Sequence, residues 1–401
     1  MKISNVSTKK VLLLICLVSA VVLILAIIWH NLNFSFFVGL LFNDAKEFTE
    51  KGIITSNFMP IGYSGFLGSC LKIGGTSGIP TCQAFIYIGI LFAAFWFLKV
   101  KNVKGILLLL GVLAIVFHPV LFLNTWRIHD GNLTVLLLLG FLATGISAMR
   151  SGKKRDLIIS GIFAGLLFVV RQNTLPLLLV ALLFMRNKNQ TKIDYLSKAS
   201  LFLIIAAIFM GGANLILKQK FIYVGNQGYY NLFSGSNEYS AKYLLKDFSG
   251  ENSHEEALKA RGFSNVEKFE ERLNFSPEIY KKLSLDYIKK YPADYLKLTA
   301  LKAYTLFRPG YHKPENYEAT IGEILKQTLK IILAAPFFIW LFLVYKTRKK
   351  IFEKENLFVF LAVIFYIAPF LIANADPRYR FPLDIIFIAD SFCRAKQLFI
   401  S

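Results

Sequence analysis

The chain has 401 residues, of which 55% are hydrophobic, and its mean hydropathy is +0.52. Repeated apolar runs near span length are unusual in soluble proteins, so this composition excludes an ordinary soluble domain and predicts an all-α integral membrane protein. The formal net charge of +21 does not indicate nucleic acid, because much of it falls in short loops between apolar runs, where it sets membrane orientation. We therefore predict membrane lipids, and no nucleic acid, among the partners.

The predicted spans begin with residues 11–30, a run that follows Lys9 and Lys10. Its apolar length exceeds the roughly 7–15 residues of a signal-peptide core, so we interpret it as a retained signal anchor. The runs at 157–170 and 174–185 are short for two full crossings, which leaves two spans or a re-entrant hairpin open. Residues 1–401 are predicted to form a single polytopic domain. The remaining spans are predicted at 84–98, 105–123, 132–149, 197–217, 327–345, 357–372 and 381–393.

Basic residues concentrate in alternate short loops, near residues 2–10, 99–104, 150–155, 186–198, 346–354 and 394–396. The positive-inside rule places such loops in the cytoplasm. We therefore predict a multi-pass protein of the cytoplasmic (inner) membrane with both termini inside. Two longer segments, 31–83 and 218–326, then face outward. The second is expected to carry surface helices, one of them with Ser276 as N-cap and Pro277 in its first turn.

Ionisable residues recur in the predicted outer turns, within "FNDAKEF", "NTWRIHDGN", "VVRQNT" and "NADPRYRFPL". Guanidinium groups suit phosphate through bidentate, charge-assisted bonds, and a nearby carboxylate suits general-base activation of a hydroxyl. Together they suggest phosphate-linked chemistry at the outer face. Arginines that reach lipid headgroups, a helix cap or a polar turn are the competing explanations. The residues concerned are Asp44, Arg127, His129, Asp130, Arg171, Asp376, Arg378 and Arg380.

Metal and nucleophile sites have little support in the sequence. Among the histidines, His129 has an acidic neighbour in a short outer turn, Asp130. The chain contains no HExxH or paired-cysteine zinc spacing, no GxSxG elbow and no Walker loop. We therefore predict no metal site and no firm cofactor; a divalent cation stays open, although the ligand spacing does not support one.

Six segments, taken in chain order, resemble the GT-C superfamily of membrane glycosyltransferases, and in particular its protein mannosyltransferase and lipid A aminoarabinose transferase branches. They are "NDAKEFTEKGIITSNFMPIGYSGFLG", "FHPVLFLNTWRIHDGNLTVLLLLG", "GLLFVVRQNTLPLLLVALLF", "YYNLFSGSNEYSAKYL", "YIKKYPADYLKLTALKAYTLF" and "RYRFPLDIIFIAD". The similarity covers nearly the whole chain, and its specificity comes from the order and spacing of the segments. The fold that this resemblance implies is a GT-C-like helical bundle with outward-facing loops.

The resemblance implies an enzyme that transfers a sugar from a polyprenyl-phosphate carrier to an acceptor outside the cytoplasm. Asp44 falls on the family's catalytic aspartate and would deprotonate the acceptor hydroxyl, which attacks the anomeric carbon with inversion. Fixed positive groups would assist the leaving phosphate. The candidates for binding that phosphate are Arg171 and Arg378, with Arg380, Arg127 and Lys72 as secondary ones. The candidates for orienting the acceptor are Asp130, His129 and Tyr379.

The acceptor is expected to be a glycolipid or a cell-envelope glycan, because the sequence shows no added soluble domain after its last span. The chain has Asn43-Asp44 where some relatives have an acidic pair. Two other functions stay open. A transporter or flippase for a lipid-linked sugar would use the same arginines and would not need Asp44. An O-antigen polymerase or ligase would use a diphosphate carrier, and the early acidic loop fits it poorly.

Cys70 and Cys82 are the two cysteines predicted to lie outside the cytoplasm. An oxidising outer compartment favours pairing, and the glycine-rich "KIGGTSGIP" between them allows the chain to fold back. A disulfide between them would hold the loop of Asp44. Two unpaired thiols are the alternative.

Overall fold

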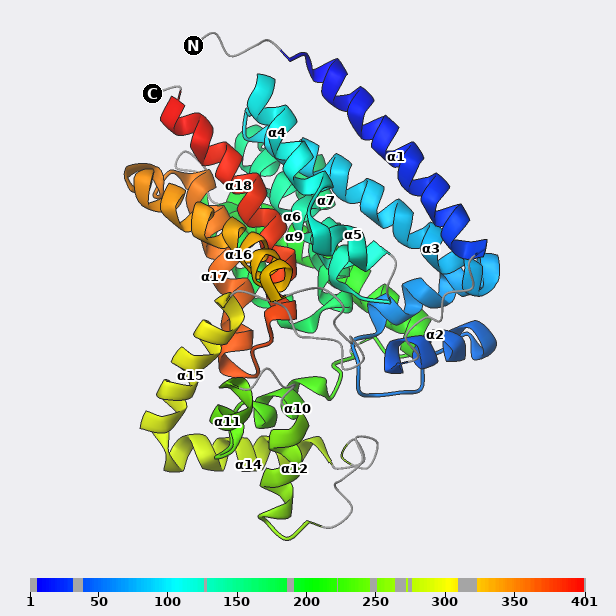
Figure 1. Ribbon diagram of the computed structural model, residues 1–401, viewed down its shortest axis with the longest axis vertical. Coiled ribbons are helices and arrows are strands. Elements are labelled where there is room, and N and C mark those ends of the chain that lie inside the picture. Colours follow the sequence, from blue (N-terminus) through cyan, green and yellow to red (C-terminus); the bar gives the residue numbers. More distant parts are fainter. Residues whose placement is uncertain are drawn as a thin grey trace. The chain divides into compact units, whose positions relative to one another are not determined.

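The computed structural model describes residues 6–31, 39–125, 128–185, 191–221, 223–245, 251–263, 272, 276–308 and 323–399. All regular elements within these ranges are helices, which confirms the all-α prediction for this part of the chain (Figure 1). The chain divides into two compact units. Unit 1 comprises residues 1–224, 339–365 and 382–401, and unit 2 comprises residues 225–338 and 366–381. The single polytopic domain stays a prediction.

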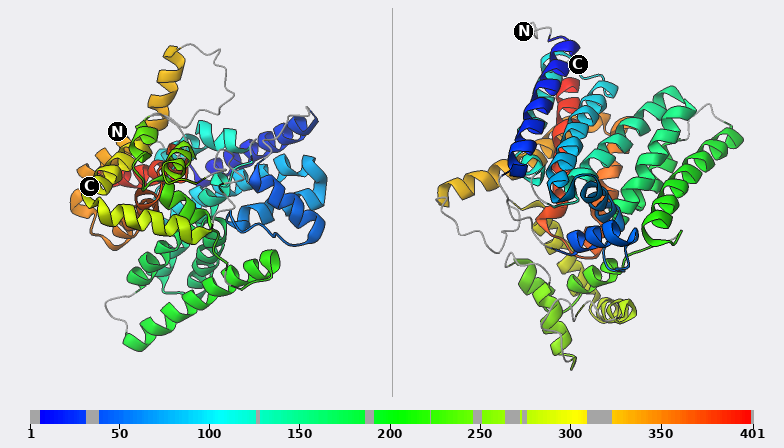
Figure 2. Two further views of the ribbon diagram at one scale, coloured as in Figure 1. Left: turned by 90° about the horizontal axis from the view of Figure 1, so that it is seen from below. Right: turned by 90° about the vertical axis from the view of Figure 1, so that its right-hand side faces the viewer.

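In unit 1, neighbouring helices pack in the order α1, α3, α6, α7 and α9 (Figure 2). Gly165 of α7 allows close packing on α9, because a Cβ there would lie 2.4 Å from the backbone oxygen of Ala206. Small residues at such crossings are typical of helices packed within membranes. The helices of this unit are α1 (Thr8–Asn31), α2 (Leu40–Lys51), α3 (Ile61–Val100), α4 (Gly105–Val116), α5 (Pro119–Thr125), α6 (Gly131–Ser151), α7 (Lys154–Val170), α8 (Pro176–Met185), α9 (Lys192–Lys218), most of α17 (Lys354–Ile372) and most of α18 (Phe381–Phe399).

Five helices in the described ranges are long and apolar enough to cross a membrane, which supports the prediction of several spans. They are Thr8–Ala26, Ile61–Val100, Gly131–Ser151, Lys192–Lys218 and Lys354–Ile372. The pair α4 and α5 adds a sixth if it is one span bent by 50°. Shorter apolar helices lie at Gln172–Met185 and Leu333–Lys346. The finer GT-C-like arrangement stays a prediction.

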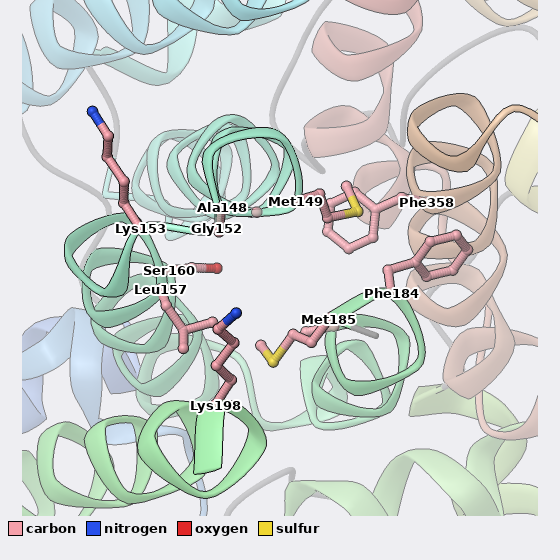
Figure 3. Close-up of a pocket in the computed structure, with 12 residues that line it drawn as sticks. Ala148, Met149, Gly152, Lys153, Leu157, Ser160, Phe184, Met185, Lys198 and Phe358 are labelled. Atoms are coloured by element: carbon pink, nitrogen blue, oxygen red, sulfur yellow. The ribbon is translucent and has the colours of Figure 1, made fainter. Parts of the chain in front are cut away.

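The chain turns back on itself between α7 and α8. Arg171 leaves helical geometry, with φ −149° and ψ 92°, and the short helix η1 (Gln172–Thr174) follows it. The far end of α8, at Phe184, lines one pocket together with Leu157 at the beginning of α7 (Figure 3). The two helices are therefore antiparallel, which excludes one continuous helix. At about 1.5 Å per residue, the ten residues of α8 cover about half of a hydrocarbon core, and the choice between two short spans and a re-entrant hairpin stays open.

Loops that the sequence assigns to the cytoplasm meet at one end of unit 1, which we call the basic end. Arg150 binds Glu355 through Nη2 and Oε2 at 2.7 Å. The ammonium of Lys101 donates to Asn356 Oδ1 at 2.6 Å, and Lys396 donates to the backbone oxygen of Lys101 at 3.4 Å. These contacts join the ends of α3, α6, α17 and α18. Their gathering at one end is what the positive-inside prediction requires, although the side of the membrane stays a prediction.

Unit 2 contains several short helices, as predicted for the second long segment. Ser276 caps α14 by accepting a hydrogen bond from the Glu278 amide, and Pro277 follows it, as expected. In the core of the unit, the ring of His254 stacks on Tyr230 with centroids 3.8 Å apart. The helices are α10 (Gln227–Ser234), α11 (Ser240–Leu245), α12 (Glu251–Lys259), α14 (Pro277–Lys290), α15 (Pro292–Phe307) and the first part of α16 (Glu323–Lys346). Their position at a membrane surface stays a prediction.

Candidate functional site

The amphipathic helix α2 directs Asp44 into unit 1. Its buried face contains Phe42, Asp44 and Ala45 and packs against the first half of α3. The contact is close, because a Cβ at Gly68 would lie 2.8 Å from the backbone oxygen of Ala45, and Thr49 Oγ1 donates to the backbone oxygen of Gly68 at 3.1 Å. Asp44 is consequently only 5% exposed.

The helix α3 that supports α2 is itself folded back. Gly74 and Gly75 break its geometry, and Gly75 has φ +61°, which favours glycine. The two limbs then approach so closely that a Cβ at Gly78 would lie 2.6 Å from the backbone oxygen of Cys70. The thiols of Cys70 and Cys82 are hydrogen-bonded across the limbs, and both are free cysteines. The structure thus brings the pair together, and the disulfide stays a prediction.

The loop of residues 52–60 lies next to Asp44 and is hydrogen-bonded to α2 and to the end of α9. Glu47 of α2 accepts hydrogen bonds from the amide and the hydroxyl of Thr55, at 2.7 and 2.5 Å. The amide of Ile54 donates to the backbone oxygen of Leu217 at 2.8 Å. In addition, the ammonium of Lys218 donates to the backbone oxygen of Ser56. The loop is therefore held between α2 and the end of α9.

Two carboxylates one helical turn apart have opposite environments. Burial, followed by the negative charge of Glu47, raises the pKa of Asp44 to about 6, against the effects of Lys218 and of a hydrogen bond from Ser56. Burial would also raise the pKa of Glu47, but the hydrogen bonds from Thr55 and Lys51 lower it to about 2. Among the described residues, Asp44 Oδ2 has no hydrogen-bond partner. Asp44 can therefore accept a proton near neutral pH, whereas Glu47 stays ionised and structural.

A second charged cluster lies at the turns before α6 and after α7. Arg171, 7% exposed, binds Asp130 in a bidentate pair, with Nε to Oδ2 and Nη2 to Oδ1 both at 2.9 Å. Burial acts to raise the pKa of Asp130, but the guanidinium of Arg171 outweighs it, and the pKa lies below its usual range. His129 Nδ1 accepts the amide hydrogen of Gly131 at 2.9 Å and lies 3.7 Å from Asp130 Oδ1.

Two tyrosines connect the turns of this pair with the segments around Asp44. Tyr63, at the start of α3, accepts a hydrogen bond from the His129 amide at 2.8 Å. Tyr223 accepts at its backbone oxygen from Gln172 Nε2 at 3.3 Å and donates its hydroxyl to the backbone oxygen of Met59 at 3.1 Å. Because α6 runs from these turns to the basic end and α7 runs back, the whole network lies at the end of unit 1 opposite the basic end.

Three residues of this network were missed by the sequence reasoning: Ser56, Lys218 and Tyr223. Lys218 belongs to the long outer segment 218–326, where a single lysine does not indicate a functional site. Its position does give one signal. Lys218 directly follows the apolar run 197–217 at the predicted outer end, where the positive-inside rule predicts few basic residues. Ser56 and Tyr223 had no comparable signal.

Arg380 belongs to unit 2, and its side chain is fully buried. Its guanidinium donates to the backbone oxygens of Leu306, Arg308 and Leu333 at 3.3, 3.1 and 3.0 Å. These bonds hold α15 and α16 together with the turn η3 (Pro377–Arg380). A role in binding phosphate would require at least some of them to open.

The other predicted residues are placed as follows. Tyr379, also in η3, stacks its ring on Phe370 with centroids 4.6 Å apart. Arg378 lies in the same turn, but its side chain falls outside the described residues, as does all of Arg127. Lys72 is exposed on the first limb of α3. Their roles in binding the donor or orienting the acceptor stay predictions.

Within the part of the chain that the structure describes, no group of three or more His, Cys, Asp or Glu side chains is placed to hold a metal ion. No protein-family model matches the chain, and comparisons with curated proteins and with solved structures find no significant similarity.

Proposed function

We propose that the protein is a glycosyltransferase of the GT-C type, which moves a sugar from a polyprenyl-phosphate carrier to a glycolipid or cell-envelope glycan at the outer face of the inner membrane. The observation that carries the proposal is the state of Asp44. This carboxylate is buried, has one oxygen without a recorded partner, and has a pKa of about 6. Such a group fits a general base for a hydroxyl.

In the proposed reaction, Asp44 takes the proton of the acceptor hydroxyl while that oxygen forms a bond to the anomeric carbon of the sugar. The bond from this carbon to the phosphate oxygen breaks, and the electron pair leaves with the polyprenyl phosphate. The attack from the opposite side inverts the configuration. Cationic groups would stabilise the charge that develops on the phosphate.

The bidentate pair of Arg171 and Asp130 refines the expected role of Arg171. Because both carboxylate oxygens of Asp130 already bind its guanidinium, the donor phosphate would have to share Arg171 with Asp130. Asp130 would then orient Arg171 rather than contact the acceptor. Arg378, with Arg380, Arg127 and Lys72 as secondary candidates, remains proposed as a phosphate-binding residue.

The proposal is tested by sugar transfer in membranes that contain the protein, with a panel of radiolabelled polyprenyl-monophosphate sugars as donors. Asp44→Asn should lower transfer by at least about 100-fold, the lower range for a lost general base. Glu50→Gln, which removes an exposed carboxylate from the same helix, is the matched control and should transfer normally. Transfer by Asp44→Asn at the wild-type rate would contradict the proposal.

The same assay separates the alternatives. A flippase would move the labelled lipid across the membrane in the Asp44→Asn variant as well as in the wild type, without forming a new glycosidic bond. An O-antigen polymerase or ligase would be active with a diphosphate donor and inactive with every monophosphate donor in the panel.

A further inference from the structure

Lys218 is a buried ammonium at the side of the network that contains Asp44. It is the last residue of α9 and is 8% exposed. Its Nζ donates to the backbone oxygen of Ser56 and lies 4.8 Å from the centroid of the Tyr223 ring. Within the described residues it forms no direct ion pair. Removing an ammonium from water is costly unless an opposite charge or several hydrogen bonds compensate it.

Asp44 supplies most of this compensation, and Glu47 adds a smaller contribution. The side chain of Asp44 is hydrogen-bonded to Ser56, the residue whose backbone oxygen accepts from Lys218. Ser56 of the loop therefore contacts both charged side chains. The carboxylate of Asp44 and the ammonium of Lys218 also attract each other electrostatically. In such surroundings, a charge acts on its neighbour far more strongly than it would in water.

We infer that Lys218 is a positioning residue of this site, whose ammonium fixes Ser56 and favours the ionised form of Asp44. The inference rests on the proposed function only in naming Asp44 as the base. This role of Lys218 explains how Asp44, with one side-chain hydrogen bond among the described residues, can still ionise and accept a proton.

The other charges near Asp44 do not supply this effect. Glu47, on the same helix, opposes ionisation of Asp44. Lys51 interacts with Glu47, to which it is bound at 3.1 Å. The titratable groups of the first limb of α3, which packs on α2, are Tyr63, Cys70 and Lys72, and none of them is among the groups that act on Asp44. Tyr223 is buried and neutral near pH 7, because burial raises the pKa of its hydroxyl.

The test is infrared difference spectroscopy of the purified protein in nanodiscs between pH 4 and pH 8, which needs no substrate. In the wild type, the band of a protonated carboxyl group should disappear with a midpoint near pH 6, and this band should be absent from Asp44→Asn. In Lys218→Met, the midpoint should rise by about one pH unit, which is about tenfold in proton affinity. Lys218→Arg keeps the charge and should restore the midpoint to within a few tenths of a unit.

Lys220→Met is the matched control. It removes an exposed positive charge two residues further along the chain and should leave the midpoint unchanged, because solvent screens that charge. Size-exclusion chromatography and circular dichroism identify any variant that fails to fold, in which case Lys218→Gln replaces Lys218→Met.

An unchanged midpoint in a folded Lys218 variant would overturn the inference. So would a variant in which only the affinity for polyprenyl monophosphate falls, since Lys218 would then be a phosphate ligand. Because the titration is measured without transfer, it can succeed or fail independently of the proposed enzymatic activity.

Discussion

At the scale of single residues, Asp44 and Glu47 show how the fold gives two similar side chains different chemistry. Both belong to α2, three positions apart. Glu47 meets the amide and hydroxyl of Thr55 and the ammonium of Lys51, so its negative charge is satisfied. Asp44 is buried and keeps one oxygen unbonded among the described residues. Asp44 therefore costs stability when it ionises, as expected of a group held for function rather than for folding.

This difference predicts a pH dependence of stability. Asp44 binds its proton more tightly in the folded protein, with a pKa of about 6, than in the unfolded chain, where it is about 4. Wild-type stability should therefore fall as the pH rises from about 4 to about 6, by about 3 kcal/mol in total. Thermal unfolding in detergent should show the Tm of Asp44→Asn rising relative to wild type over that range and levelling off above it.

Glu47→Gln is the control for this measurement. The pKa of Glu47 is lowered to about 2, so its contribution to stability is present above its ordinary pKa and is lost only as the pH falls below it. Because the charge of Glu47 also raises the pKa of Asp44, the difference in Tm between this variant and the wild type should change between pH 5 and pH 7, but much less than the difference for Asp44→Asn. A parallel rise in both variants would mean that another group titrates.

The pair of Arg171 and Asp130 predicts a coupled response to mutation. Removing one partner leaves the other charge in a largely buried site, at a cost of about 3 kcal/mol, whereas removing both leaves no charge to compensate. Arg171→Ala and Asp130→Ala should each lower Tm. The sum of the two decreases should exceed the decrease in the double variant. A double-mutant cycle in detergent measures this coupling, and strictly additive changes would show that the pair contributes no mutual stabilisation.

At the scale of elements, the folded-back helix α3 is the support of the site. Its first limb packs on α2, and its second limb is a candidate span. Gly74 and Gly75 permit the reversal, and Cys70 and Cys82 meet across it. A bond between the two sulfurs would join the part of the chain that carries α2 to a helix within the membrane.

We predict that this disulfide forms in cells with an oxidising outer compartment. Intact cells would be treated with a maleimide before and after reduction, in a background where Cys16 and Cys393 are replaced by serine. Labelling of Cys70 and Cys82 should require the reductant. Labelling of both cysteines in denatured but unreduced samples would establish that they remain thiols.

At the scale of the whole molecule, unit 1 has a basic end and, opposite it, an end that contains the residues of the proposed active site. Loops rich in Lys and Arg meet around Arg150 and Glu355, whereas Asp130 and Arg171 lie at the opposite ends of α6 and α7. We predict that these two ends face different compartments, because helices of this length and hydropathy are able to cross a membrane.

The orientation follows from the positive-inside rule and is directly testable. In a cysteine-free background, Lys154→Cys marks the basic end and Glu50→Cys marks the end with Asp44; both side chains are exposed. A membrane-impermeant thiol reagent should label Glu50→Cys in intact cells, and Lys154→Cys only after permeabilisation. The reverse pattern would place the proposed site in the cytoplasm.

The positions of the helices were determined by the sequence alone, because the property that encodes them is local. In a lipid environment, backbone groups must be satisfied within each segment, so an apolar run near span length becomes a helix whatever its neighbours are. Eight of the ten predicted spans accordingly fall within single helices, whereas 105–123 and 174–185 each cover a break between two helices. Ionisable residues in the outer turns between such helices, among them Asp44, Asp130 and Arg171, can also be recognised in the sequence one by one.

Only the tertiary structure decided what these residues do to one another. The bidentate contact of Arg171 with Asp130, the fold-back at Gly74 and the return of α8 depend on turn geometry, which hydropathy does not encode. The surroundings of Asp44 depend on Lys218, more than 170 positions further along the chain. The physical reason is that burial and charge act through space: the pKa of Asp44 depends on how deeply packing buries it and on the charges that lie near it, Glu47 of its own helix and Lys218 of α9.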